Sequence, residues 1–203
     1  PISDYSAIAD RCQPYRRVIV ENHPKIGRDR LVQFHDRLAR ASTGTPPVLE
    51  VAVGLETIHP AWLKQLGKSM TLSDFDRYAE FLREQDVDLR VFLIVGFPGA
   101  TLAEAMDWSM RSVHHACASG AKHISLIPAR VGNGWDGLSD QLVLPTVEDM
   151  LALQRDLLMT PMVSSACPVF TIDVWGFDSS EGDSRVIDAI ERQNRTQLPE
   201  PTS

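Results

Sequence analysis

The sequence predicts an α/β protein, an arc of a (β/α) barrel with parallel strands, from two observations. Apolar, β-rich runs alternate along the chain with amphipathic helical patterns, which is typical of right-handed βαβ units and a parallel sheet. Polar or glycine-rich residues also follow the first four predicted strands, at Glu21, Glu56, Gly96 and Pro128. A site shared by successive strand ends favours a barrel arc over an open doubly wound sheet, which concentrates its site at one switch point.

Signals in the first half of the chain define five elements. Ser3 is a candidate N-cap, and Pro60 suits the first turn of a short helix. Leu31, Phe34 and Leu38 stand at helical spacing, whereas RVIVEN and VLEVAV are apolar and β-rich. These signals predict helices over 3–10, 27–41 and 60–66, and strands over 17–22 and 48–53.

The second half continues the alternation. Thr71 and Asp74 have the spacing of a capping box, with Ser73 as a further capping candidate. Gly120 ends a long helical pattern, and Pro145 opens another. We expect helices over 73–85, 102–119, 145–159 and 183–195, and strands over 89–95, 122–127 and 169–174.

Length and composition predict one domain. A chain of 203 residues, 43% of them hydrophobic, buries one substantial core, which we expect over residues 1–196, with a flexible tail at 197–203. The net charge of −7 gives no basic footprint for nucleic acid. No apolar run reaches the roughly 18 residues of a membrane span, and the first residues read as a helix rather than a signal peptide.

The cysteines and histidines predict no metal site. Cys12, Cys117 and Cys167 stand far apart and form neither a CxxC pair nor a disulfide framework, which favours a reducing cytoplasm. Isolated cysteines of this kind are typically small buried apolar residues. The histidines show no ligand spacing, and the adjacent His114 and His115 diverge on a helix.

The segment LRVFLIVGFPGAT, residues 89–101, carries the strongest single signal for a site. An apolar strand ends there in a tight loop just before a helix, and in α/β folds ligands bind at the carboxyl ends of such strands. Gly96 and Gly99 let a ligand approach the backbone, and Thr101 caps a helix whose N–H groups suit polar ligand atoms. A plain strand-to-helix turn explains the segment equally well.

Glu21 and Glu56 each follow an apolar strand, so that carboxylates stand at successive strand ends. Two rim carboxylates suit hydroxyl pairs, amines or metals. The alternative for each is a cap on the following helix.

The order of these motifs resembles the later two-thirds of the radical S-adenosylmethionine (SAM) enzyme core. The similar branch contains elongator-type catalytic subunits, tRNA methylthiotransferases and oxygen-independent coproporphyrinogen oxidases. Residues 21–24 match its Glu-x-x-Pro, 54–57 its Gly-x-Gln/Glu-Ser/Thr, and 96–101 its Gly-x-Pro-Gly-x-Thr. Lys68 stands in its Leu-x-Lys/Arg context, and SLIPARVGNG follows in order. The resemblance covers roughly residues 3–160.

This chain departs from the family pattern in one region. The family's CxxxCxxC loop, which holds a [4Fe-4S] cluster through thiolates, is absent, as is the glycine-rich strand end that binds the SAM amino group. The resemblance therefore implies a barrel open at its amino-terminal edge, where a missing segment or a partner would pair with the first strand. It also implies a cluster only in the complete protein, and weak or absent SAM binding by an inactive isolated chain.

The resemblance implies an iron–sulfur oxidoreductase-like function, the reductive cleavage of SAM to a 5′-deoxyadenosyl radical by the complete protein. Glu21 and Glu56 would contact the ribose or the polar groups of the methionine moiety, and Lys68 would pair with its carboxylate. The resemblance also implies that the adenine packs against Ile94, Gly96, Phe97, Ile127 and Pro128. The remaining implied cofactor-binding residues are Gly99 and Thr101.

The glycine-rich loop after the fourth strand suits the substrate side. Arg130 and Asn133 are the candidates there, with Asp173 and Trp175 as weaker ones. The alternative function is a non-catalytic scaffold that binds SAM, a nucleotide or a partner on a degenerate radical SAM fold. The substrate itself is not predicted.

Overall fold

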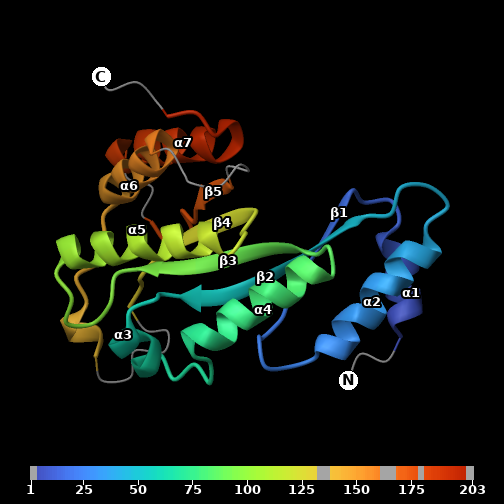
Figure 1. Ribbon diagram of the computed structural model, residues 1–203. Helices are drawn as coiled ribbons and strands as arrows, with labels where there is room; N and C mark the ends of the chain where they lie inside the picture. Colours follow the sequence, from blue (N-terminus) through green and yellow to red (C-terminus); the bar gives the residue numbers. More distant parts are fainter. Residues whose placement is uncertain (1–3, 132–137, 161–167, 178–180, 200–203) are drawn as a thin grey trace.

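A computed structural model describes residues 4–131, 138–160, 168–177 and 181–199. Its strands form one all-parallel sheet in chain order, as Figure 1 shows, and the sheet is not closed into a barrel. This arrangement confirms the predicted α/β fold, a partial β/α barrel. The strands are β1 (Arg17–Glu21), β2 (Val48–Glu56), β3 (Asp88–Val95), β4 (His123–Pro128) and β5 (Val169–Ile172).

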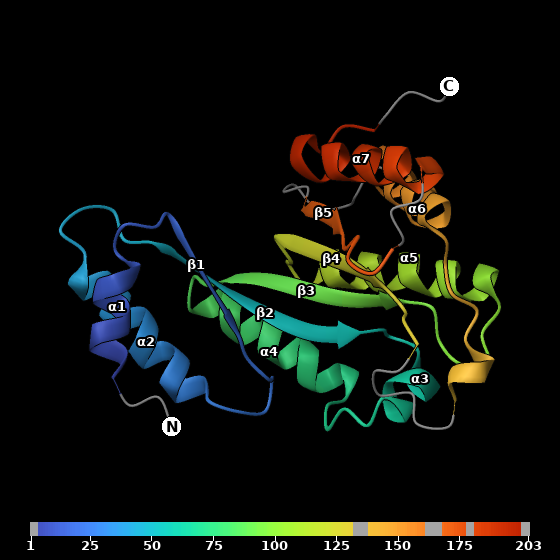
Figure 2. The ribbon, with the colours of Figure 1, turned by 180° about the vertical axis from the view of Figure 1, so that it is seen from behind.

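Helices alternate with the strands, and two views of the ribbon place them around the sheet (Figures 1 and 2). Because parallel strands need crossover connections, each strand is separated from the next by at least one helix. The helices are α1 (Tyr5–Cys12), α2 (Arg28–Ala41), α3 (Pro60–Gln65), α4 (Leu72–Glu84), α5 (Leu102–Ala118), α6 (Val147–Met159) and α7 (Glu181–Thr196), with a short 3₁₀ turn η1 (Ser139–Gln141).

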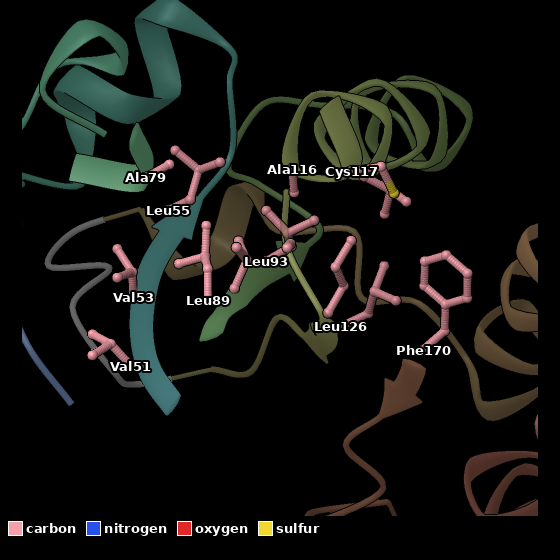
Figure 3. Packing of buried hydrophobic residues seen from close by; sticks show 14 of the residues in the cluster. Val51, Val53, Leu55, Ala79, Leu89, Leu93, Ala116, Cys117, Leu126 and Phe170 are labelled. Carbon is pink, nitrogen blue, oxygen red and sulfur yellow. The ribbon is translucent and has the colours of Figure 1, made fainter. Parts of the chain in front are cut away.

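The core lies between the sheet and the helices. Every second residue of β3 is buried, and Figure 3 shows Leu55 of β2 beside Ala79 of α4 and Leu93 of β3 beneath Ala116 of α5. The intervening β3 residues are only partly buried, because the strand alternates its side chains between the two faces of the sheet. That second face carries the polar and site-forming residues.

Several element ends differ from the predicted ones. Asp4 caps α1, because its carboxylate accepts from Ala7 N at 2.9 Å, whereas the predicted cap Ser3 lies outside the described residues. Thr71 forms the predicted capping box with Asp74, so Ser73 is not the cap. Helix α6 starts at Val147 rather than at Pro145, because Thr146 is its N-cap and forms a capping box with Asp149.

An ion network crosses the amino-terminal half of this second face. The carboxylate of Glu50 on β2, whose side chain is 2% exposed, pairs with Arg17 of β1 and Arg90 of β3. Arg17 also pairs with Asp88 at 2.6 Å. Burial alone would raise the pKa of Glu50, but the hydrogen bonds and charges of Arg90 and Arg17 together lower it. The network therefore keeps a buried carboxylate charged across three strands.

Among the helices that the structure describes, none is long and apolar enough to cross a membrane. The single domain with a flexible tail stays a prediction.

Candidate functional site

The carboxyl ends of β1 and β2 border a pocket of about 430 Å³. Three of the predicted residues, Glu21, Glu56 and Lys68, line it together. The rim forms because parallel neighbouring strands end at the same edge of the sheet. The other lining residues are Asn22, His23, Pro24, Ile26, Ala52, Gly54 and Phe92.

Glu56 owes its position to an irregular strand end. The β2–β3 register shifts between Gly54 and Glu56, and Glu56 has a φ of 65°, in the left-handed region. The bulge turns its carboxylate into the pocket, where the side chain is 12% exposed and pairs with Lys68. Glutamate rarely adopts a positive φ, and backbone strain of this kind is found most often at functional sites.

Lys68 comes back to β2 after the short helix α3. Gly67, with a φ of 63°, reverses the chain, and the Lys68 ammonium then donates to the Gly54 carbonyl oxygen at 3.2 Å while pairing with Glu56. A Cβ at Gly54 would lie 2.6 Å from Lys68 Nζ and also clash with the Glu56 carboxylate. The absence of a side chain at Gly54 leaves the space that the Glu56–Lys68 pair occupies against the strand.

Glu21 and its neighbours form the β1 side of the pocket. Glu21 is exposed, and within the described residues no ion pair holds its carboxylate. Asn22 is fixed instead, since it donates to the hydroxyl of buried Tyr78 at 2.7 Å and accepts from His23 N. Glu21 is thus a charged group open to a ligand beside a rigid loop.

The loop 96–101 has a different role in the geometry. A Cβ at Gly96 would lie 3.0 Å from the Ala129 side chain, so packing demands this glycine, whose φ is 107°. Gly99 N donates to the Gln141 carbonyl at 3.0 Å, and Thr101 makes a capping box with Glu104. These residues do not line the pocket described above.

Phe97 points away from solvent. Its side chain is 2% exposed, and its ring stacks on Trp62 with the centroids 4.5 Å apart. The predicted contact between Phe97 and adenine would therefore require this stack to open, and it stays a prediction.

The remaining cofactor candidates lie on β3 and β4. Ile94 and Ile127 are paired neighbours in the sheet and both are half-buried, whereas Pro128 is buried. They share the carboxyl edge with the pocket because the strands are parallel. Their contact with an adenine ring stays a prediction.

Arg130 occupies the end of β4 and is held by the end of β5. Its guanidinium donates to Asp173 at 2.9 Å and lies 4.8 Å from the ring centroid of Trp175, which is 72% exposed. The structure thus joins Arg130, Asp173 and Trp175 in one cluster. The other substrate-side candidate, Asn133, lies outside the described residues.

Phe92 is one of the pocket residues that the sequence reasoning missed. It lies two residues before Ile94, and strand alternation places both on the same face, opposite Gly54 in the sheet register. That period-two pattern was the available signal. Asn22, His23 and Ile26 were missed because the loop after β1 has no regular pattern.

Within the described ranges, no group of three histidine, cysteine or acidic side chains is placed to hold a metal ion. Cys12 is half-buried on α1 and Cys117 is buried on α5, two helices that lie well apart in both views of the ribbon (Figures 1 and 2). Cys167 lies outside the described residues.

A solved structure shares this fold, and others are more weakly similar to it. The chain is similar to the Elp3 of the archaeon Methanocaldococcus infernus, with a TM-score of 0.56, 12% identity, and coverage of 87% of this chain and 42% of that one. It is also similar to the radical SAM methyltransferase TsrM of Kitasatospora setae with cobalamin and a [4Fe-4S] cluster bound, with a TM-score of 0.41, 18% identity, and coverage of 78% and 28%. TsrM with tryptophan and a SAM analogue gives a TM-score of 0.41, 17% identity, and coverage of 84% and 31%.

The chain spans less than half the length of each of these proteins. No protein-family profile matches the sequence, and no curated protein matches it. The predicted resemblance to the radical SAM core is confirmed for the fold.

Proposed function

We propose that this chain is the SAM-binding portion of a radical SAM enzyme and that the pocket beside Gly54 receives SAM. The observation that carries the proposal is the Glu56–Lys68 pair, seated on a bare glycine at the carboxyl end of β2. Its supports are the order of the sequence motifs and the fold shared with Elp3.

The charges of the pocket suit a zwitterionic ligand that carries a diol. Lys68, whose side chain is 30% exposed, offers an ammonium to a carboxylate, and Glu56 would exchange its lysine partner for an amine or a hydroxyl pair. Glu21 supplies a second acceptor, and Phe92 gives an apolar wall for an aromatic ring. The volume of about 430 Å³ is in the range of small-molecule sites.

Of the two implied cofactors, SAM and a [4Fe-4S] cluster, only SAM has a fitting pocket among the described residues. The described residues offer SAM a charged pocket, but they do not bring thiolates together for a [4Fe-4S] cluster. We therefore assign the cluster to the complete protein only. In enzymes of this type, SAM supplies a 5′-deoxyadenosyl radical when it is reduced by one electron.

The chain's own residues would then bind and orient the cofactor. Lys68 would hold the carboxylate end, and Glu56 and Glu21 would fix the polar groups around it, which sets the direction of the ligand along the rim. Ile94 and Ile127 would exclude water from the carboxyl edge of β3 and β4.

A nuclear magnetic resonance titration of the labelled full chain with SAM tests the proposal, because it detects weak binding. We expect shifts at residues 54–57 and 68, and loss of those shifts in Lys68→Met. The matched control is Lys64→Met, which removes an exposed lysine from α3 only four residues away.

Shifts that persist in Lys68→Met, or that appear only away from the pocket, would contradict the proposed site. Binding of adenosine with an equal affinity to that of SAM would favour the alternative of a nucleotide-binding scaffold.

A further inference from the structure

The polar pocket is backed by an aromatic cluster that the proposed function does not use. His59, Trp62 and Phe97, here called the aromatic stack, join the loop after β2, helix α3 and the loop after β3. The Trp62 ring lies 4.1 Å from the His59 ring at an interplanar angle of 26°, and 4.5 Å from the Phe97 ring at 10°. Both values describe stacked rings at favourable separation.

The stack is anchored to helix α5. Trp108 meets His59 edge-on at 4.5 Å, and Arg111 lies 4.8 Å from the Trp108 ring centroid. Ile58 N donates to Ser112 Oγ at 3.1 Å, which ties the same loop to the same helix. The start of α3 is therefore held to α5 by the contact between the His59 and Trp108 rings and by the hydrogen bond from Ile58 N to Ser112 Oγ.

Helix α3 connects this anchor to the pocket. His59 caps the helix by accepting from Trp62 N at 3.3 Å, and the helix ends just before Gly67 and Lys68. A helix of six residues is too short to be stable by itself, so its position depends on packing. Trp62 and Leu66 supply that packing against Phe97 and Ala100.

We infer that Trp62 is a positioning residue for Lys68. By stacking on His59 and Phe97, it fixes α3 so that the Lys68 ammonium returns to Gly54 and Glu56. Trp62 is not among the described residues that line the pocket, so its effect on a ligand passes through Lys68. The effect of Trp62 on SAM binding rests on the proposed function. Its effect on the position of Lys68 does not, because that position exists in the chain without a ligand.

Lysine acetylation of the full chain measures this position directly. Under limiting acetic anhydride, followed by peptide mass analysis, the paired Lys68 should react more slowly than the exposed Lys64. Trp62→Ala should raise the Lys68 rate by roughly three- to tenfold, the effect of losing about one aromatic pair. Trp62→Phe retains a flat ring and should restore the protection, and Lys64 should react equally in every variant.

Each result decides the inference. An unchanged Lys68 rate in folded Trp62→Ala, or a rate in Trp62→Phe as high as in Trp62→Ala, would overturn it. If Trp62→Ala fails to fold by circular dichroism, Trp62→Leu, which fills the space without a stacking ring, takes its place with the same criteria.

A double-mutant comparison separates this inference from the proposed function. Trp62→Ala should weaken SAM binding in the wild-type background and have no further effect in Lys68→Ala. If Lys68→Ala itself leaves SAM affinity unchanged, the proposed function fails, and the acetylation result still stands or falls by itself.

Discussion

Lys68 Nζ lies 3.2 Å from the carbonyl oxygen of Gly54, fourteen residues earlier in the chain. The same ammonium pairs with Glu56, so residues 54–68 form a closed loop at the carboxyl end of β2. A neutral carbonyl and a carboxylate thus share one cation. This arrangement leaves Lys68 partly exposed and ready to exchange partners with an anionic ligand.

Substitution Gly54→Ala should break this arrangement while leaving the sheet intact. The new Cβ would lie 2.6 Å from Lys68 Nζ, so the ammonium must move. Because it is the end of a flexible, partly exposed side chain, we expect a loss of at most about 1 kcal/mol in the free energy of unfolding and weaker SAM binding. Urea unfolding and SAM titration measure the two effects. Gly44→Ala is the matched control, because a Cβ there meets nothing within 4 Å. Equal behaviour of the two variants would contradict the predicted contact.

Substitution of Glu56 should separate stability from binding. Both Glu56→Ala and Glu56→Gly remove the carboxylate and should weaken SAM binding by the complete protein. Because Glu56 has a φ of 65°, the glycine variant should be the more stable of the two by about 1 kcal/mol.

The control for Glu56 is Asp86, which has a φ of 54° away from the pocket. In urea unfolding, Asp86→Gly should likewise be more stable than Asp86→Ala. Neither variant should change the affinity for SAM. Wild-type affinity in Glu56→Ala would show that this carboxylate is only a structural group.

His123 should make the fold sensitive to mild acid. Burial, together with the charge of Arg90, lowers the pKa of His123 from an ordinary value of 6.5 to about 4. The unfolded chain therefore takes up a proton first, so stability is complete above about pH 6.5 and falls as the pH drops towards 4.

The measurement is urea unfolding at about pH 7.5 and pH 5. His123→Gln should lose less stability between these values than the wild type does. His114→Gln, on the exposed side of α5, should behave like the wild type. An equal loss in all three proteins would show that His123 does not carry the effect.

The outer edge of β1 should promote association of the isolated chain. β1 pairs only with β2 in the described sheet, and Ile19 on it is 49% exposed. Ile19→Lys places a charge on this edge and should reduce the mass seen by light scattering at rising concentration. Val143→Lys, at a residue 48% exposed away from the sheet, should not. If the wild-type chain stays monomeric at every concentration, the prediction that β1 promotes association is wrong.

The alternation of apolar runs and helical patterns was enough to predict an α/β fold with parallel strands. Parallel pairing follows from it, because each pair of strand patterns is separated by a helix-length connection. The capping box of Thr71 with Asp74 was equally local, since it depends on residues three apart. Such features are set by short-range chemistry.

Other element ends needed the neighbouring strands. The predicted second strand stopped at Val53, but β2 continues to Glu56 because its bulge keeps it paired with β3. The stacking of Phe97 on Trp62 was likewise not predicted, and the ligand contact of Phe97 stays a prediction. Neither partner is near enough in the sequence to be read from a local pattern.

The sequence by itself determined that Glu21, Glu56 and the loop 96–101 end parallel strands at one edge, because strand direction follows from connectivity. Only the tertiary structure decided which of them share a pocket. Lys68 joins Glu56 because α3 is packed by the aromatic stack and Gly54 leaves space for the ammonium. Loop closure of this kind depends on contacts between elements, which no local pattern specifies.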